Sequence, residues 1–199
     1  MSLYKQQREQ VKEVILNTAI ALFKEKGYDK VSVDEITKKV GVAKGTFYNF
    51  FSSKKDILMC WSEQQFHQMD GKSLANAGKS IQDSLFTLID ILVSIIKQEQ
   101  GLFVSFLREI MQMSKVLNTE SKFDFKQILK DVISGSIDYS SLGEECMELK
   151  IRVLNNTLFY EILEWFCLNK PIEGLDMHLK NIIRVCLYGV LNNIKESKD

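Results

Sequence analysis

The sequence contains few residues that interrupt helices. One proline occurs among 199 residues, and 45% of the chain is hydrophobic. Proline removes a backbone donor and ends or kinks a helix, so its scarcity leaves room for long helices. The apolar residues run for long distances without the alternation that is typical of strands. We therefore expect an all-α protein.

Metal-binding and catalytic patterns are also scarce. Four cysteines are spaced too widely for a zinc site or a disulfide framework: Cys60, Cys146, Cys167 and Cys186. The two histidines, His67 and His178, have no second ligand at a chelating spacing. The sequence has no phosphate-binding glycine loop and no nucleophile elbow. We expect no metal, no cofactor and no enzymatic activity.

Targeting signals are not evident either. No apolar run reaches the length of a membrane span, and the first residues, MSLYKQQREQ, are too polar for a signal peptide. We expect a cytoplasmic protein. The net charge is zero, yet residues 1–60 hold eleven Lys or Arg against seven Asp or Glu. This excess suits phosphate binding, although an ordinary solvated surface would explain it equally well.

The stretch from Ser32 to Leu58, SVDEITKKVGVAKGTFYNFFSSKKDIL, has the pattern of two short helices around a tight turn. Gly41 interrupts the first apolar stripe, and a second helix can begin at Ala43 or Lys44. The spacing predicts a helix-turn-helix.

The sequence predicts where the first helix of this motif begins and which side of the second helix faces inward. Ser32, with Glu35 three positions later, predicts a capping box at the start of the first helix. Phe47 and Phe51 lie four residues apart on the second helix and should face inward. The residues left to point outward are suited to DNA contacts: Lys44, Gly45, Thr46, Tyr48 and Asn49. With Ser32 and Lys54 they form the expected DNA-binding set.

Two sequence motifs cover most of the region from Ala19 to Lys54. AxxLFxxxGY occupies Ala19 to Tyr28, and SVDEIxxxVGVAKGTFYxxFxSK occupies Ser32 to Lys54. Together they resemble the TetR family of bacterial transcriptional regulators over about the first third of the chain. The resemblance implies a DNA-binding regulator that senses a small molecule.

The outward residues divide into two chemical groups. Four can contact phosphates without reading sequence: Lys44, Thr46, Tyr48 and Lys54. Asn49 can pair with adenine, Thr46 can contact a thymine methyl, and Gly45 allows a close approach to the groove. Each also has a plainer explanation as a solvated or packing residue. Ala43 replaces the serine of many family members, and Phe50 replaces a histidine or tyrosine, so two phosphate contacts are lost.

A first helix from about Lys5 to Lys26 should support this motif, and Gly27 should end it. Its expected apolar face comprises Val11, Val14, Ile15, Thr18, Ala19, Leu22 and Phe23. The resemblance places its first residues near DNA, where Lys5 and Arg8 would contact phosphates or remain ordinary solvated cations.

The remaining chain predicts a second, larger domain. We expect a fourth helix from Ser53 to about Asp70 and a linker from Gly71 to Gly78. Further helices should start at Ile81, after a break at Gly101, and near Phe125, with a loop from Gly135 to Gly143. The predicted domains are a three-helix helix-turn-helix DNA-binding domain at 1–53 and a helical effector-binding and dimerisation domain at 54–199.

The last two predicted helices, Glu144 to Leu168 and Leu175 to Ile194, are apolar on more than one side. A helix of this kind must be covered on all sides, so we expect a two-fold four-helix bundle with a second subunit. A large monomeric core is the alternative. The expected interface residues are Leu158, Ile162, Trp165, Leu179, Ile183, Leu187 and Val190.

The resemblance further implies a ligand pocket in the larger domain. Large apolar side chains supply candidates for its lining, although each is as well explained by an ordinary core: Trp61, Phe86, Phe103, Phe106, Met111, Phe159 and Trp165. We expect a homodimeric repressor that a small-molecule effector releases from its double-stranded DNA operator. An activator, or a helical interaction protein of the same fold that does not bind DNA, is the alternative.

Overall fold

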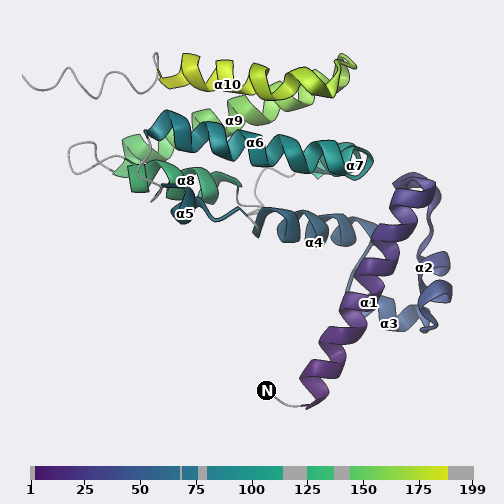
Figure 1. Ribbon diagram of the computed structural model, residues 1–199. Coiled ribbons are helices and arrows are strands. Elements are labelled where there is room, and N and C mark those ends of the chain that lie inside the picture. Colours follow the sequence, from purple (N-terminus) through teal and green to yellow (C-terminus); the bar gives the residue numbers. More distant parts are fainter. Residues whose placement is uncertain (1–2, 68, 76–79, 114–124, 137–143, 188–199) are drawn as a thin grey trace, which may run out of the picture. The chain divides into compact units, whose positions relative to one another are not determined.

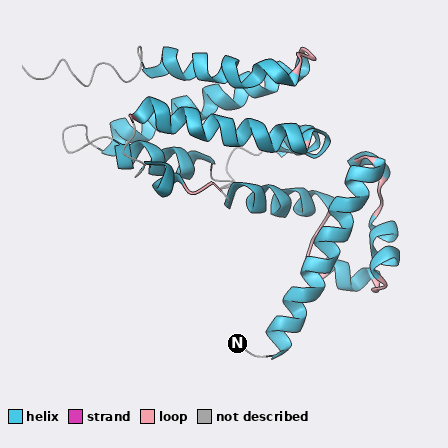
Figure 2. Ribbon diagram, viewed as in Figure 1, coloured by secondary structure: helices cyan, strands magenta, loops and turns pink. Residues whose placement is uncertain are grey.

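The structure, a computed structural model, describes residues 3–67, 69–75, 80–113, 125–136 and 144–187. Over these ranges the protein is helical and has no strand, as predicted (Figure 2). Figure 1 labels its helices, which in chain order are α1 (Leu3–Lys26), α2 (Val33–Val40), α3 (Lys44–Tyr48), α4 (Lys54–His67), α5 (Gly71–Ala75), α6 (Ile81–Gln98), α7 (Gln100–Met113), α8 (Phe125–Ser136), α9 (Glu144–Cys167) and α10 (Leu175–Cys186). None of these described helices has the length and apolarity that crossing a membrane requires.

The chain forms two compact units. Unit 1 comprises residues 1–65 and 99–123, and unit 2 comprises residues 66–98 and 124–199. Most of α4, and all of α7, therefore belong with the N-terminal helices. The division differs from the boundary predicted after residue 53, because α7 is far from the motif in sequence and its packing on unit 1 leaves no local signal.

In unit 1, two glycines end helices where the sequence predicts. Gly27 follows α1 with φ at +88°, and Gly41 follows α2 with φ at +80°. Residues with a Cβ rarely adopt these angles, so glycine lets the chain turn sharply after each helix. A short 3-10 turn, Tyr28–Lys30, then leads into α2.

The buried face of α1 differs from the predicted face at one position. Val14 is 51% exposed, whereas Leu16 is only 3% exposed and lies in the core with Ile15 and Ala19. Successive helical residues are rotated by about 100°, which places Val14 on the far side from the arc that Leu16 joins.

The first part of the predicted linker is a helix, and its remainder, 76–78, lies outside the described residues. The segment Gly71–Ala75 forms α5, which packs closely against α8. A Cβ at Gly71 would lie 2.7 Å from the carbonyl oxygen of Ile128, and one at Gly135 would lie 2.4 Å from the Cβ of Ala75. The small residues that resemble a linker in sequence are required by this close helix contact.

Two smaller boundaries also differ. Gly101 lies in the first turn of α7, which begins at Gln100 immediately after α6, so it does not separate the two helices. The helix α8 continues through Gly135 to Ser136, and the rest of the predicted loop lies outside the described residues.

Unit 2 is a bundle of long helices. The helix α6 packs against α8 and α10, and α9 also packs against both of these helices (Figure 1). Each contributes fully buried aliphatic side chains, among them Leu88 of α6, Leu129 of α8 and Leu158 of α9. Burial of such side chains contributes about 1.5–3 kcal/mol each relative to exposure.

Candidate nucleic-acid interface

The short helix α3 is held by aromatic packing on one side. Phe47 is fully buried and Phe51 is 2% exposed, with their ring centroids 5.7 Å apart. The ring of Tyr48 meets Phe47 edge-on at 5.4 Å but remains 50% exposed. The predicted inward face is confirmed, and it fixes which side of α3 points outward.

The opposite side of α3 carries the residues predicted to point outward. Lys44, Gly45, Tyr48 and Asn49 are exposed, and Thr46 is half-buried. A Cβ at Gly45 would have no neighbouring atom within 4 Å. Since nothing inside the protein needs a glycine there, the open backbone is available to an external partner.

An ion pair joins α3 to α2 at this surface. The Lys44 ammonium lies 2.7 Å from a carboxylate oxygen of Asp34, and both side chains are largely exposed. The hydrogen bond to Asp34 and its negative charge raise the pKa of Lys44 above the ordinary value. Lys44 is therefore a cation throughout the physiological pH range, and an incoming phosphate would compete with Asp34 for it.

Ser32 serves as the cap that the sequence predicts. Its hydroxyl accepts a hydrogen bond from the backbone N–H of Glu35 at 3.1 Å. The Glu35 carboxylate pairs with Lys26 of α1, and this hydrogen bond lowers the pKa of Glu35. The hydrogen bond from the Glu35 backbone to Ser32 is the first half of the predicted capping box. The Glu35 carboxylate, which would complete the box, instead pairs with Lys26 and connects α2 to α1.

Lys54 has a different environment from the other predicted phosphate contacts. Its ammonium donates to the backbone carbonyls of Tyr28 at 2.8 Å and Val31 at 2.7 Å. It also lies 4.5 Å from the centroid of the Tyr28 ring. These contacts hold the first turn of α4 against the segment between α1 and α2, so Lys54 stabilises unit 1 from within.

Tyr28 extends this polar cluster to α7. Its hydroxyl donates to Glu109 at 3.1 Å, and the Lys55 ammonium lies 3.7 Å from the other oxygen of that carboxylate. Arg108 pairs with Asp29 at 2.6 Å. Sequence reasoning missed this role for α7, since no local pattern shows which charges meet across 80 residues.

The predicted ligand-pocket residues are divided between the two units. Trp61, Phe103 and Phe106 are buried in unit 1, and Met111 of the same unit is 44% exposed. Phe86, Phe159 and Trp165 belong to unit 2 and are half-buried.

Trp165 has a structural role within unit 2. Its indole N–H donates to the Pro171 carbonyl at 3.1 Å, and its ring lies 4.9 Å from that of His178. His178 in turn lies 2.7 Å from Glu161. These contacts join the end of α9 to the start of α10.

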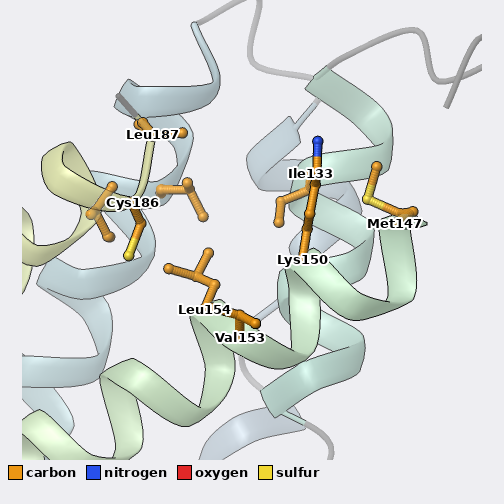
Figure 3. A pocket seen from close by; sticks show the side chains of 9 residues that line it. Ile133, Met147, Lys150, Val153, Leu154, Cys186 and Leu187 are labelled. Atoms are coloured by element: carbon orange, nitrogen blue, oxygen red, sulfur yellow. The ribbon is translucent and has the colours of Figure 1, made fainter. Parts of the chain in front are cut away.

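A cavity of unit 2 lies elsewhere (Figure 3). It has a volume of about 10 Å³, roughly what one water molecule needs. Apolar side chains of α6, α8, α9 and α10 line it together with one cation: Leu85, Ile133, Met147, Lys150, Val153, Leu154, Ile183, Cys186 and Leu187. Burial raises the pKa of the Cys186 thiol, which is therefore protonated at neutral pH.

Four of the residues predicted for a subunit interface are covered by their own chain. Leu158, Leu179 and Ile183 are fully buried in the core of unit 2, and Ile162 is 5% exposed. The prediction was wrong for these four, because an apolar pattern shows that a face is covered but not by which neighbour. Trp165 and Leu187 are half-buried, and Val190 lies outside the described residues.

A different apolar surface is exposed on the same two helices. It is formed by Leu149, Val153 and Tyr160 of α9, with Met177 and Val185 of α10, which are 40–69% exposed. We call these five residues the outer apolar face. Residues at i, i+4 and i+11 lie on one side of α9, so its three members form a stripe.

Comparisons with known proteins agree with this architecture. Residues 15–59 match the model of "Bacterial regulatory proteins, tetR family". The chain is 39% identical over 82 residues to the uncharacterized HTH-type transcriptional regulator YvdT of Bacillus subtilis, covering 41% of each chain. It is 27% identical over 118 residues to IcaR of Staphylococcus epidermidis, the HTH-type negative transcriptional regulator of the biofilm operon icaADBC, covering 59% of this chain and 63% of IcaR.

A solved structure with the same fold is that of Thermus thermophilus FadR, a TetR-family transcriptional repressor in complex with lauroyl-CoA. It has a TM-score of 0.71 and 20% identity, covering 89% of this chain and 94% of FadR. The curated matches span about two fifths of YvdT and just under two thirds of IcaR. Residues 15–59 thus match the family model of the TetR regulators, and the fold of the described residues is similar to that of a TetR-family transcriptional repressor.

Proposed function

We propose that this protein is a DNA-binding transcriptional repressor of the bacterial cytoplasm. The observation that carries the proposal is the outward side of α3, which presents Lys44, Tyr48 and Asn49 around the bare backbone of Gly45. These groups are exposed, whereas the opposite side of the helix is anchored by buried phenylalanines. The arrangement suits insertion of α3, as the recognition helix, into the major groove.

The recognition helix offers contacts of two kinds. Lys44 and Tyr48 bind phosphates and position the helix, and Thr46 adds a hydroxyl. Asn49, which ends α3, pairs with an adenine edge. Lys54 stabilises the domain instead of contacting DNA, since its ammonium is engaged by two carbonyls. With few base-reading groups, DNA shape supplies part of the specificity.

Two copies bind a two-fold symmetric operator. The outer apolar face supports dimerisation through α9 and α10, because exposed large apolar patches mark interaction sites. We expect V185E to yield monomers in analytical ultracentrifugation and to weaken operator binding, whereas S94E, at a polar, exposed position of α6, should leave the dimer intact. A dimer that persists in V185E would place the interface elsewhere.

Unit 2 is the effector-binding part in this proposal. The FadR complex suggests acyl-CoA as the first ligand class to test. The cavity of unit 2 is lined by apolar side chains and Lys150, which suits a ligand with an apolar chain and a negative charge. The cavity is small, so ligand entry requires its side chains to move. Lauroyl-CoA should weaken operator binding by roughly 5–150-fold, the usual range of allosteric coupling. Equal affinity with and without lauroyl-CoA would exclude this ligand.

Footprinting on DNA that flanks the coding region tests the central proposal. We expect protection of a two-fold symmetric site whose half-sites lie one helical turn, or a multiple of it, apart. Absence of any DNA affinity would favour a helical interaction protein of the same fold. Transcription assays on the protected site distinguish repression from activation.

A further inference from the structure

The first turns of α1 extend beyond the core of unit 1. The residues from Lys5 to Gln10 are all exposed, and the first buried residue after Lys5 is Ile15. At a rise of 1.5 Å per residue, roughly 15 Å of helix precede the core. Figure 1 shows this part of α1 running past α3.

A contact between a cation and an aromatic ring joins this extension to the rest of unit 1. The guanidinium carbon of Arg8 lies 5.5 Å from the centroid of the Phe50 ring. Phe50 is half-buried and follows α3 by two residues, next to Asn49 and close in sequence to Tyr48. The ring therefore holds a cation beside the C-terminal end of the recognition helix.

The contact with Phe50 leaves the hydrogen-bond donors of the guanidinium available. The phenyl ring has no oxygen or nitrogen acceptor, so the five N–H donors of Arg8 can serve other partners. Arg8 is exposed, and an acidic neighbour in the same turn, Glu9, is paired with Lys12 at 3.2 Å. A planar, permanently charged fork in this position suits a phosphate group.

We propose that Phe50 is a positioning residue, whose ring holds the Arg8 guanidinium beside the end of the recognition helix so that Arg8 can bind a phosphate. The phosphate contact of Arg8 is an expectation from the family resemblance, and the inference adds the residue that fixes its position. The Phe50 side chain cannot itself donate a hydrogen bond to DNA, so its role is to place a cation there. This inference rests on the proposed function, because it requires that α3 binds DNA.

The test is the salt dependence of binding to the footprinted site by the full-length protein. Each phosphate contact contributes about 0.9 to the slope of log affinity against log salt. R8A should reduce the slope by about 0.9 for each subunit bound to DNA. It should weaken binding to all DNA sequences alike. The matched control is K12A, which removes the same charge from the same helix at a residue already paired with Glu9.

Variants of Phe50 test the positioning role. F50L removes the ring and should lower the slope while Arg8 keeps its charge, and F50Y, which retains an aromatic face, should restore it. R8A and F50L combined should resemble R8A alone, because both changes remove one interaction. Equal thermal stability of these variants and the parent would separate the effect from misfolding.

The outcomes are distinct. Unchanged slopes in R8A, equal losses in R8A and K12A, or additive effects of R8A and F50L would each overturn the inference while leaving DNA binding by α3 intact. A loss restricted to particular base sequences would also overturn it, since base reading would then replace phosphate binding. A parent protein without DNA affinity would instead overturn the proposed function.

Discussion

The ammonium of Lys54 lies 2.8 Å from the carbonyl oxygen of Tyr28 and 4.5 Å from the centroid of the Tyr28 ring. One side chain at the start of α4 thus satisfies the backbone of a segment 26 residues earlier and covers its aromatic ring. The Val31 carbonyl receives a second hydrogen bond from the same ammonium.

We predict that K54M destabilises the protein without changing its salt dependence of DNA binding. The methionine keeps the aliphatic stem but leaves two carbonyls without this donor, at a cost of about 1–3 kcal/mol. For a chain of this size, 1 kcal/mol corresponds to roughly 2–4 °C in melting temperature. Calorimetry and binding titrations provide the two readouts. An unchanged melting temperature together with a lower salt slope would show that Lys54 binds phosphate instead.

The Lys44–Asp34 pair predicts opposite effects of two substitutions. D34N should strengthen DNA binding by roughly two- to fivefold, the range expected for one exposed charge interaction, because it frees Lys44 and removes a negative charge near the phosphates. K44A should weaken DNA binding and lower the salt slope by about 0.9 for each subunit bound to DNA. Binding titrations at several salt concentrations measure both. Weaker binding by D34N would mean that Asp34 orients Lys44 productively.

The close contact between α5 and α8 predicts that alanine at Gly135 lowers the stability of the protein, whereas alanine at a glycine outside this contact does not. G135A should destabilise the protein by about 1–3 kcal/mol, because the new Cβ would lie 2.4 Å from that of Ala75. G101A is the matched control, since its Cβ would meet nothing within 4 Å and alanine favours a helix by up to about 1 kcal/mol. Denaturant unfolding compares the two. Equal stability of G135A and the parent would indicate that α5 can move away from α8.

Glu148 predicts a change in stability at low pH. Hydrogen bonds from Lys126 and Lys130, at 2.6 and 2.9 Å, lower the pKa of Glu148 to about 2. Its unfolded value is near 4.5, so the carboxylate stabilises the fold above pH 4.5 and loses this effect as the pH falls towards 2.

The difference in unfolding free energy between the parent and E148Q should therefore be present at pH 6 and vanish near pH 2. The exposed Glu145 of the same helix supplies the control variant, E145Q, which should follow the parent. Urea denaturation at several pH values measures the difference. A difference that is constant with pH would assign the effect to packing.

Local chemistry made part of this protein predictable. The cap at Ser32, the turn at Gly41 and the inward side chain of Phe47 each follow from residues within one or two turns of helix, and the structure confirms all three. The exposed side of α3 was predictable for the same reason, since burial of one helical face determines the other.

Interactions between distant segments were not predictable. Lys54 resembles a surface cation in sequence, yet the carbonyls of Tyr28 and Val31 engage it. Leu158 and Leu179 have the pattern of covered residues, but the pattern does not distinguish a partner subunit from the helices of the same chain. Gly71 has the composition of a linker, and only its closeness to α8 explains the glycine.

The discontinuous composition of unit 1 limits how regulators of this type can be recombined. Helices α1 to α3 and most of α4 share their compact unit with α7, whose Glu109 and Arg108 bind Tyr28 and Asp29. A chimera that joins residues 1–65 to the remainder of another regulator would lose these partners and leave Tyr28 facing foreign side chains. Transfer of operator specificity between such proteins should therefore require two inserted segments, the N-terminal helices and the matching α7, rather than one.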